Sequence, residues 1–169
     1  MRGHADPVSG SFLASLDARE RSELEQLGVV REYPRGSMLM LQGEPEDRVV
    51  VLLSGRVKVA RADRTGRELM LDIGDPGEAL GELAFIDGQP RIATVTALEP
   101  VAALVVGSET FHAYLARSPH VAAALTEMMS HYGDGDRPAG RLRAGLHRPI
   151  HARDACAPAA ARRANRSRG

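Results

Sequence analysis

The 169-residue sequence contains one cysteine, no tryptophan and few aromatic side chains. A single cysteine, Cys156, cannot form an internal disulfide, nor can it supply a cysteine-rich zinc site or an iron–sulfur cluster. Because aromatic residues make up only 4% of the chain, a hydrophobic core has to be aliphatic. The composition therefore predicts a globular domain packed with leucine, valine, isoleucine, methionine and alanine.

Long apolar runs are also absent. No run approaches the length that spans a bilayer, and the first seven residues, Met-Arg-Gly-His-Ala-Asp-Pro, lack the apolar stretch of a secretory signal. These two absences predict a cytoplasmic protein without membrane contact.

The net charge is zero, but the charges are unevenly placed. Residues 133–169 contain nine arginines and three aspartates, so this tail carries +6 and residues 1–132 carry −6. An asymmetry of this kind requires separate interpretations for the acidic body and the basic tail.

The tail at residues 133–169 shows neither a helical nor a strand period. Such a segment buries too little apolar surface to offset its ordering entropy, so we predict that it is disordered and contains no helix-turn-helix. Three interpretations remain open: an arginine-rich arm that contacts nucleic-acid phosphates in a salt-dependent way, a solvated tail, or the product of a shifted reading frame. The second and third are favoured over the first.

Helical signals flank a strand-rich region. After a flexible leader at residues 1–10, Asp17 and Glu20 have the spacing of a capping box, and Gly28 is expected to end the first helix. A second helical stretch is predicted at 111–132, with an interruption near Pro119.

Between these helices, turn signals recur every 8–12 residues and apolar residues alternate with polar ones, as they do at 56–61. Further strands are predicted around Val30 and Glu32, around Met38 and Met40, and at 49–53, 93–98 and 101–106. This spacing is typical of an all-β sandwich or barrel.

The run at 81–95, Gly-Glu-Leu-Ala-Phe-Ile-Asp-Gly-Gln-Pro-Arg-Ile-Ala-Thr-Val, carries the chemistry. Gly81 and Glu82 are predicted to begin a very short helix, whose free N–H groups favour an anion. Nine residues after Glu82, Arg91 can donate a bidentate contact to two phosphate oxygens. An ionised Glu82 is a strong acceptor for a ligand hydroxyl. The layout suits a small anion with a hydroxyl, and a cyclic nucleotide has both features.

These motifs resemble the phosphate-binding cassette of cyclic-nucleotide-binding domains, here Gly-Glu-Leu-Ala followed by Pro-Arg-Ile-Ala-Thr-Val. The resemblance covers about residues 11–132 and includes Gly43-Glu44 and the Leu-Ser-Gly-Arg-Val run at 53–57. The frame is similar to the sensor half of Crp/Fnr-type transcription regulators, and the Glu82–Arg91 spacing also suits regulatory subunits of cyclic-nucleotide-dependent kinases. It implies a mainly β fold with flanking helices, an eight-stranded jelly roll or double-stranded β-helix.

The resemblance also implies a ligand-binding role for seven residues. Glu82 would accept a hydrogen bond from the ribose 2′-OH and Arg91 would bind the phosphate. Ile92 stands where cGMP-selective members often carry a hydroxyl, which favours cAMP over cGMP. The full candidate set is Gly81, Glu82, Leu83, Ala84, Arg91, Ile92 and Ala93, with Gly81, Leu83 and Ala84 offering backbone groups.

A Crp/Fnr regulator continues its last helix into a dimerisation helix and then a helix-turn-helix, whereas only 37 residues follow Tyr132 here. We therefore expect a cAMP-type sensor domain that lacks its DNA-binding half, with a homodimer through residues 120–132 left open. The alternatives are a ligand-free jelly-roll interaction module and a DNA-binding regulator that uses the basic tail. For Glu82 and Arg91 taken alone, the alternative is a surface salt bridge of about 0–1 kcal/mol.

No catalytic or metal-ligating constellation is predicted. Ser108 and Ser130 have no nearby His/Asp arrangement that would activate a nucleophile. The six histidines are interpreted as surface or tail residues. We expect neither an enzyme nor a metal site.

Overall fold

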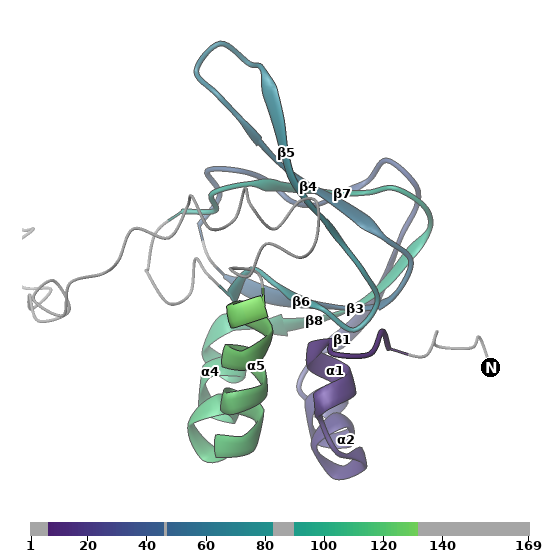
Figure 1. Cartoon of the computed structure of the whole chain (residues 1–169), viewed down its shortest axis with the longest axis vertical. Coiled ribbons are helices and arrows are strands. Elements are labelled where there is room, and N and C mark those ends of the chain that lie inside the picture. The colour runs from purple at the N-terminus through teal and green to yellow at the C-terminus, as the bar shows by residue number, and fades with distance from the viewer. Residues whose placement is uncertain (1–6, 46, 83–89, 132–169) are drawn as a thin grey trace, which may run out of the picture.

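The computed structural model describes residues 7–45, 47–82 and 90–131. Within these residues, eight strands form two antiparallel four-stranded sheets, and helices lie on one side of the strand-rich body (Figure 1). The predicted leader at 1–10 lies partly outside the described residues, and the predicted tail lies wholly outside them.

The chain crosses between the two sheets after every strand except at the β4–β5 hairpin, as expected of a jelly roll. The first sheet, which contacts the helices, has the order β1 (Val29–Tyr33), β8 (Val101–Gly107), β3 (Arg48–Ser54) and β6 (Ala79–Leu80). The second has the order β2 (Met38–Met40), β7 (Thr94–Ala97), β4 (Val57–Ala62) and β5 (Glu68–Gly74). This arrangement confirms the predicted fold class.

Strand β3 is buried on both faces because it separates two hydrophobic clusters. Its residues Val49, Val51 and Leu53 pack toward the helices, while Val50 and Leu52 pack between the sheets. Successive side chains of a strand point to opposite faces. The continuous apolar run at 49–53 therefore serves two cores at once.

The first helical pair comprises α1 (Phe12–Ser15) and α2 (Ala18–Gln26). The predicted capping box is confirmed: the Glu20 N–H donates to the Asp17 carboxylate at 2.8 Å, and the Asp17 N–H donates to Glu20 Oε2 at 2.9 Å. The helix ends just before Gly28, where an added Cβ would collide with strand β8. The start of the helix is thus set by polar side chains and its end by close packing.

The second helical pair comprises α4 (Ser108–Arg117) and α5 (Pro119–His131), which confirms the predicted break at Pro119. Phe111 of α4 packs edge-on against Phe12 of α1, with ring centroids 6.3 Å apart. The buried Tyr114 hydroxyl donates to the Glu20 carbonyl oxygen at 2.8 Å. These contacts join the two helical pairs over the first sheet.

Two strands were missing from the sequence-based prediction: β5 and the two-residue β6. Strand β5 pairs with β4 from Val57–Gly74 to Ala62–Glu68, and the resulting hairpin projects away from the helices (Figure 1). Residues 61–70 of this hairpin are all exposed. The first three residues of β5 are exposed and its buried positions include Asp72, so its sequence carries no clear alternation of apolar and polar residues.

Candidate functional site

The Arg91 side chain is buried, although arginine is usually exposed, and only 3% of its surface is accessible. Its Nη1 atom donates to the Gly81 carbonyl oxygen at 3.3 Å, and Nη2 donates to the Arg48 carbonyl oxygen. Nη2 also lies 3.8 Å from Oδ1 of Asp47. The guanidinium therefore lies where the end of β6 meets the start of β3.

The backbone of Arg91 is fixed by the loop after β2. The Gly43 N–H donates to the Arg91 carbonyl oxygen at 2.8 Å, and the Arg91 N–H donates to the Glu44 carbonyl oxygen at 2.9 Å. The Gly-Glu motif recognised in the sequence thus supports Arg91 through main-chain groups.

Gly81 has a φ of +94°, a backbone conformation that favours glycine. A Cβ atom at this position would overlap with Nη1 of Arg91 and would lie 3.0 Å from Met40 Cε and 3.2 Å from the Arg48 carbonyl oxygen. The absence of a side chain is therefore what lets the guanidinium reach the backbone at residue 81.

Glu82 follows Gly81 and is also buried, with 3% of its surface exposed. Arg91 thus contacts Gly81 directly, and the neighbouring Glu82 is as buried as Arg91. Leu83 and Ala84, together with the rest of the predicted very short helix, lie outside the described residues. Their predicted backbone roles stay predictions.

Ile92 and Ala93 have different surroundings. Ile92 is exposed, whereas Ala93 is buried in the cluster between the two sheets. Ala93 is a core residue in this structure, and its predicted role in binding stays a prediction, as does that of Ile92.

A cluster of charged side chains lies beside the guanidinium of Arg91. Arg48 Nη1 is 2.9 Å from Asp47 Oδ1, and Arg48 Nη2 is 3.6 Å from Glu44 Oε2. Asp47 and Arg48 were absent from the predicted site. One signal was present in the sequence: Arg48 directly precedes the apolar run at 49–53.

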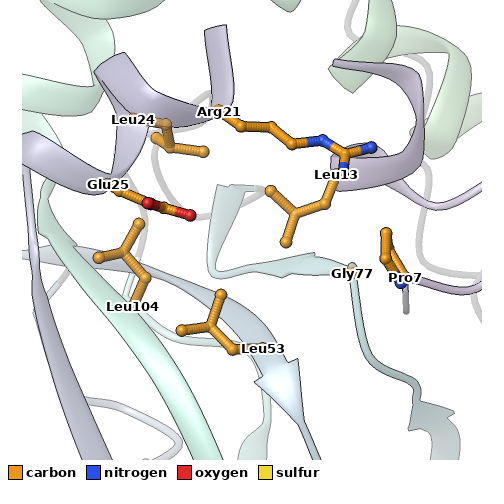
Figure 2. Close-up of a pocket in the computed structure, with 8 residues that line it drawn as sticks. All are labelled: Pro7, Leu13, Arg21, Leu24, Glu25, Leu53, Gly77 and Leu104. Atoms are coloured by element: carbon orange, nitrogen blue, oxygen red, sulfur yellow. The ribbon is translucent and has the colours of Figure 1, made fainter. Parts of the chain in front are cut away.

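A separate cavity of about 90 Å³ lies between the first helical pair and the first sheet (Figure 2). Leucines from both layers surround it, with Arg21 and Glu25 of α2 at its edge. None of the candidate ligand-binding residues lines this cavity, so it is distinct from the Gly81–Arg91 site.

The described residues contain no group of three or more His, Cys, Asp or Glu side chains that could hold a metal ion. No helix in the described ranges is long and apolar enough to cross a membrane.

The chain matches the cyclic nucleotide-binding domain over residues 30–118. It is 31% identical over 99 residues to the CRP-like cAMP-activated global transcriptional regulator of Mycobacterium tuberculosis, which covers 59% of this chain and 44% of that relative. It is 40% identical over 90 residues to the acetyltransferase Pat of Mycolicibacterium smegmatis, which covers 53% of this chain and 26% of that relative. The match thus spans less than half the length of either relative.

The fold is similar to the crystal structure of the Thermus thermophilus catabolite activator protein. The TM-score is 0.65 at 27% identity, and the match covers 80% of this chain and 59% of that chain. The chain therefore belongs to the family of cyclic nucleotide-binding domains. The predicted resemblance to the sensor half of Crp-type regulators is confirmed.

Proposed function

We propose that the Gly81–Arg91 site binds cAMP and that the chain is the sensor part of a transcription regulator rather than an enzyme. The observation that carries this proposal is the buried guanidinium of Arg91, packed against the side-chain-free backbone of Gly81. A planar guanidinium suits a phosphate with two acceptor oxygens. The glycine beside it leaves the space in which this guanidinium lies.

In this proposal each part of the ligand has its own partner. Arg91 binds the cyclic phosphate, and the carboxylate of Glu82 accepts a hydrogen bond from the ribose 2′-OH. Glu82 is buried beside Gly81, so this bond forms away from bulk water. Ile92 next to the arginine offers no hydrogen bond to guanine, which supports cAMP over cGMP.

Calorimetric titration with cAMP and cGMP tests the proposal. The wild-type chain should bind cAMP more tightly than cGMP. Replacing a buried charged partner costs about 2–5 kcal/mol, so Arg91→Ala should weaken binding by at least about thirtyfold. Arg91→Lys keeps the charge but loses the bidentate geometry, so it should also bind weakly. Arg64→Ala, in the exposed hairpin, is the control and should bind as the wild type does.

An absence of binding to folded wild-type protein would reject the proposal. The alternative is a ligand-free interaction module. A ligand at 100 times its Kd stabilises a protein by about 2.7 kcal/mol, so an unchanged melting temperature in saturating cAMP would favour that alternative.

The regulator assignment rests on the relatives and goes beyond the described domain. The match to the catabolite activator covers 80% of this chain, which is more than the domain match at residues 30–118. Sequence-specific DNA binding by the complete protein, measured by gel shift at physiological salt with and without cAMP, tests this assignment. Acetyl transfer that responds to cAMP would instead place the chain with the enzyme relative.

A further inference from the structure

The ladder between β4 and β7 stops before β4 ends. Pairing runs from Val57–Ala97 to Ala60–Thr94, and a continued register would place Ile92 opposite Ala62. The chain at Arg91 pairs with Gly43 and Glu44 instead. Arg91 therefore lies where the segment leading into β7 changes its pairing from residues 43–44 to β4. Among the described residues, Ala62 of β4 has no strand partner on that side.

The side chain of Gln42 fills the position that this change of partner leaves. Its Nε2 donates to the Ala62 carbonyl oxygen at 3.1 Å, and its Oε1 accepts from the Ala62 N–H at 2.8 Å. A primary amide offers a donor and an acceptor together, so Gln42 pairs with Ala62 as a peptide group of a neighbouring strand would.

The main chain at Gln42 is tied to the other side of the same junction. The Gln42 N–H donates to Thr94 Oγ1 at 3.1 Å, and the next residue, Gly43, donates to the Arg91 carbonyl oxygen at 2.8 Å. Gln42 thus forms hydrogen bonds with Ala62, in the last pair of the β4–β5 ladder, and with Thr94, at the start of β7. Its neighbour Gly43 bonds to Arg91.

The outer part of the β4–β5 hairpin extends beyond the ladder between β4 and β7, which ends at Ala60. Its turn is closed by its own bonds, in which Asp63 accepts from Thr65 and Arg67, and residues 61–70 are exposed. Gln42 is therefore well placed to hold the base of the hairpin at a fixed distance from the Arg91 main chain.

From this arrangement we infer that Gln42 is a positioning residue, which sets the place of Arg91 and transmits occupancy of the Arg91 site to the β4–β5 hairpin. The inference rests on the proposed binding of a cyclic nucleotide and adds a route for its regulation. When a phosphate binds, a shift of residues 91–93 displaces Gly43 and Thr94. The hydrogen bonds of Gln42 then transmit this displacement to Ala62.

Gln42→Met is the informative variant because it keeps the length of the side chain and removes both amide hydrogen bonds. Gln26→Met is the matched control, since Gln26 is exposed on α2 and donates only to Ser22 there. Because Gln42→Met removes both amide hydrogen bonds at the junction beside Arg91, it should bind cAMP about tenfold more weakly than the wild type. Gln26→Met should bind with unchanged affinity.

Amide NMR supplies a readout that a merely structural role would leave unchanged. Saturating cAMP should shift the amide resonances of residues 62–67 in the wild type and in Gln26→Met, and these shifts should vanish in Gln42→Met. Wild-type affinity together with persisting hairpin shifts in Gln42→Met would overturn the inference.

The free protein separates failure of this inference from failure of the proposed function. Without ligand, Gln42→Met should raise hydrogen exchange at the Gly43 and Arg91 amides as well as at Ala62. If the wild type binds no cyclic nucleotide, the proposed function fails. Hydrogen exchange at the Gly43 and Arg91 amides still tests the link between Gln42 and the Arg91 main chain. Unchanged exchange at Gly43 and Arg91 would then overturn the link, and raised exchange would uphold it.

Discussion

Gly81 lies directly against the guanidinium of Arg91, and its carbonyl oxygen is 3.3 Å from Nη1. Two independent properties of glycine are used at this position. The backbone has a positive φ, and the space that a Cβ would fill belongs to the guanidinium. The residue at position 81 therefore controls where the arginine can lie.

Gly81→Ala should abolish binding of cyclic nucleotide in calorimetric titration, because the new methyl group displaces the guanidinium. The positive φ should cost about 1–3 kcal/mol of stability besides. Gly66→Ala is the control, since Gly66 has a similar φ of +82° but nothing within 4 Å of an added Cβ. That control should lose stability and keep its affinity. Equal affinities for the two variants would contradict the steric argument.

Asp47→Asn should strengthen binding of an anionic ligand, because Asp47 is a negative charge 3.8 Å from Nη2 of Arg91. Two unit charges at this distance interact by about 1 kcal/mol in water, so the gain should be no more than about fivefold for this exposed carboxylate. Salt screening should reduce the gain. Glu99→Gln removes a charge paired with Arg56 away from the site, and its affinity should be unchanged. Weaker binding by Asp47→Asn would show that Asp47 orients the arginine rather than competing for it.

The stability of the domain should fall between about pH 10 and pH 12 because of Tyr114. Burial, followed by the charges of Glu20 and Glu23, raises the pKa of Tyr114 from 10.0 to about 12. A pKa raised in the folded state stabilises the fold below the unfolded pKa, and that contribution is lost as the pH rises through the folded value. Tyr114→Phe should remove this alkaline loss in urea unfolding curves.

At neutral pH, Tyr114→Phe should cost about 1 kcal/mol, because the hydrogen bond to Glu20 disappears. Tyr33→Phe is the control, in a half-buried residue of β1. If Tyr114→Phe and the wild type lose stability in parallel above pH 10, another group is responsible.

Phe12→Ala should destabilise the domain by about 3–5 kcal/mol, since Phe12 is fully buried and packs on Phe111. Chemical denaturation measures this cost. Val8→Ala, at an exposed apolar residue, is the control and should cost much less. A cost below about 1 kcal/mol for Phe12→Ala would show that α1 is not part of the cooperative core.

Local signals were read correctly from the sequence because neighbouring residues determine them. The capping box of Asp17 and Glu20 needs only a separation of three residues, and the helix break needs only Pro119. The proximity of Gly81 and Arg91 also followed from one short motif. The spacing of turns predicted an all-β sandwich or barrel, and the family resemblance implied the jelly roll.

The remainder of the site depends on strand register, which no local pattern shows. The Arg48 carbonyl oxygen and Arg91 are 43 residues apart, and Gln42 and Thr94 are 52 apart. Such pairs meet only after two sheets have formed. Asp47, Arg48 and Gln42 were therefore absent from the predicted site.

Strand β3 places alternate side chains in the helical cluster and in the cluster between the sheets. Undocking the helices would expose Val49, Val51 and Leu53 on a strand whose other face still packs within the roll. The two clusters cannot melt independently, so thermal unfolding of the domain should show a single two-state transition. A shift in the packing of the helices therefore reaches the second sheet through the backbone of β3. The first residue of β3, Arg48, also accepts a hydrogen bond from Arg91 through its carbonyl oxygen.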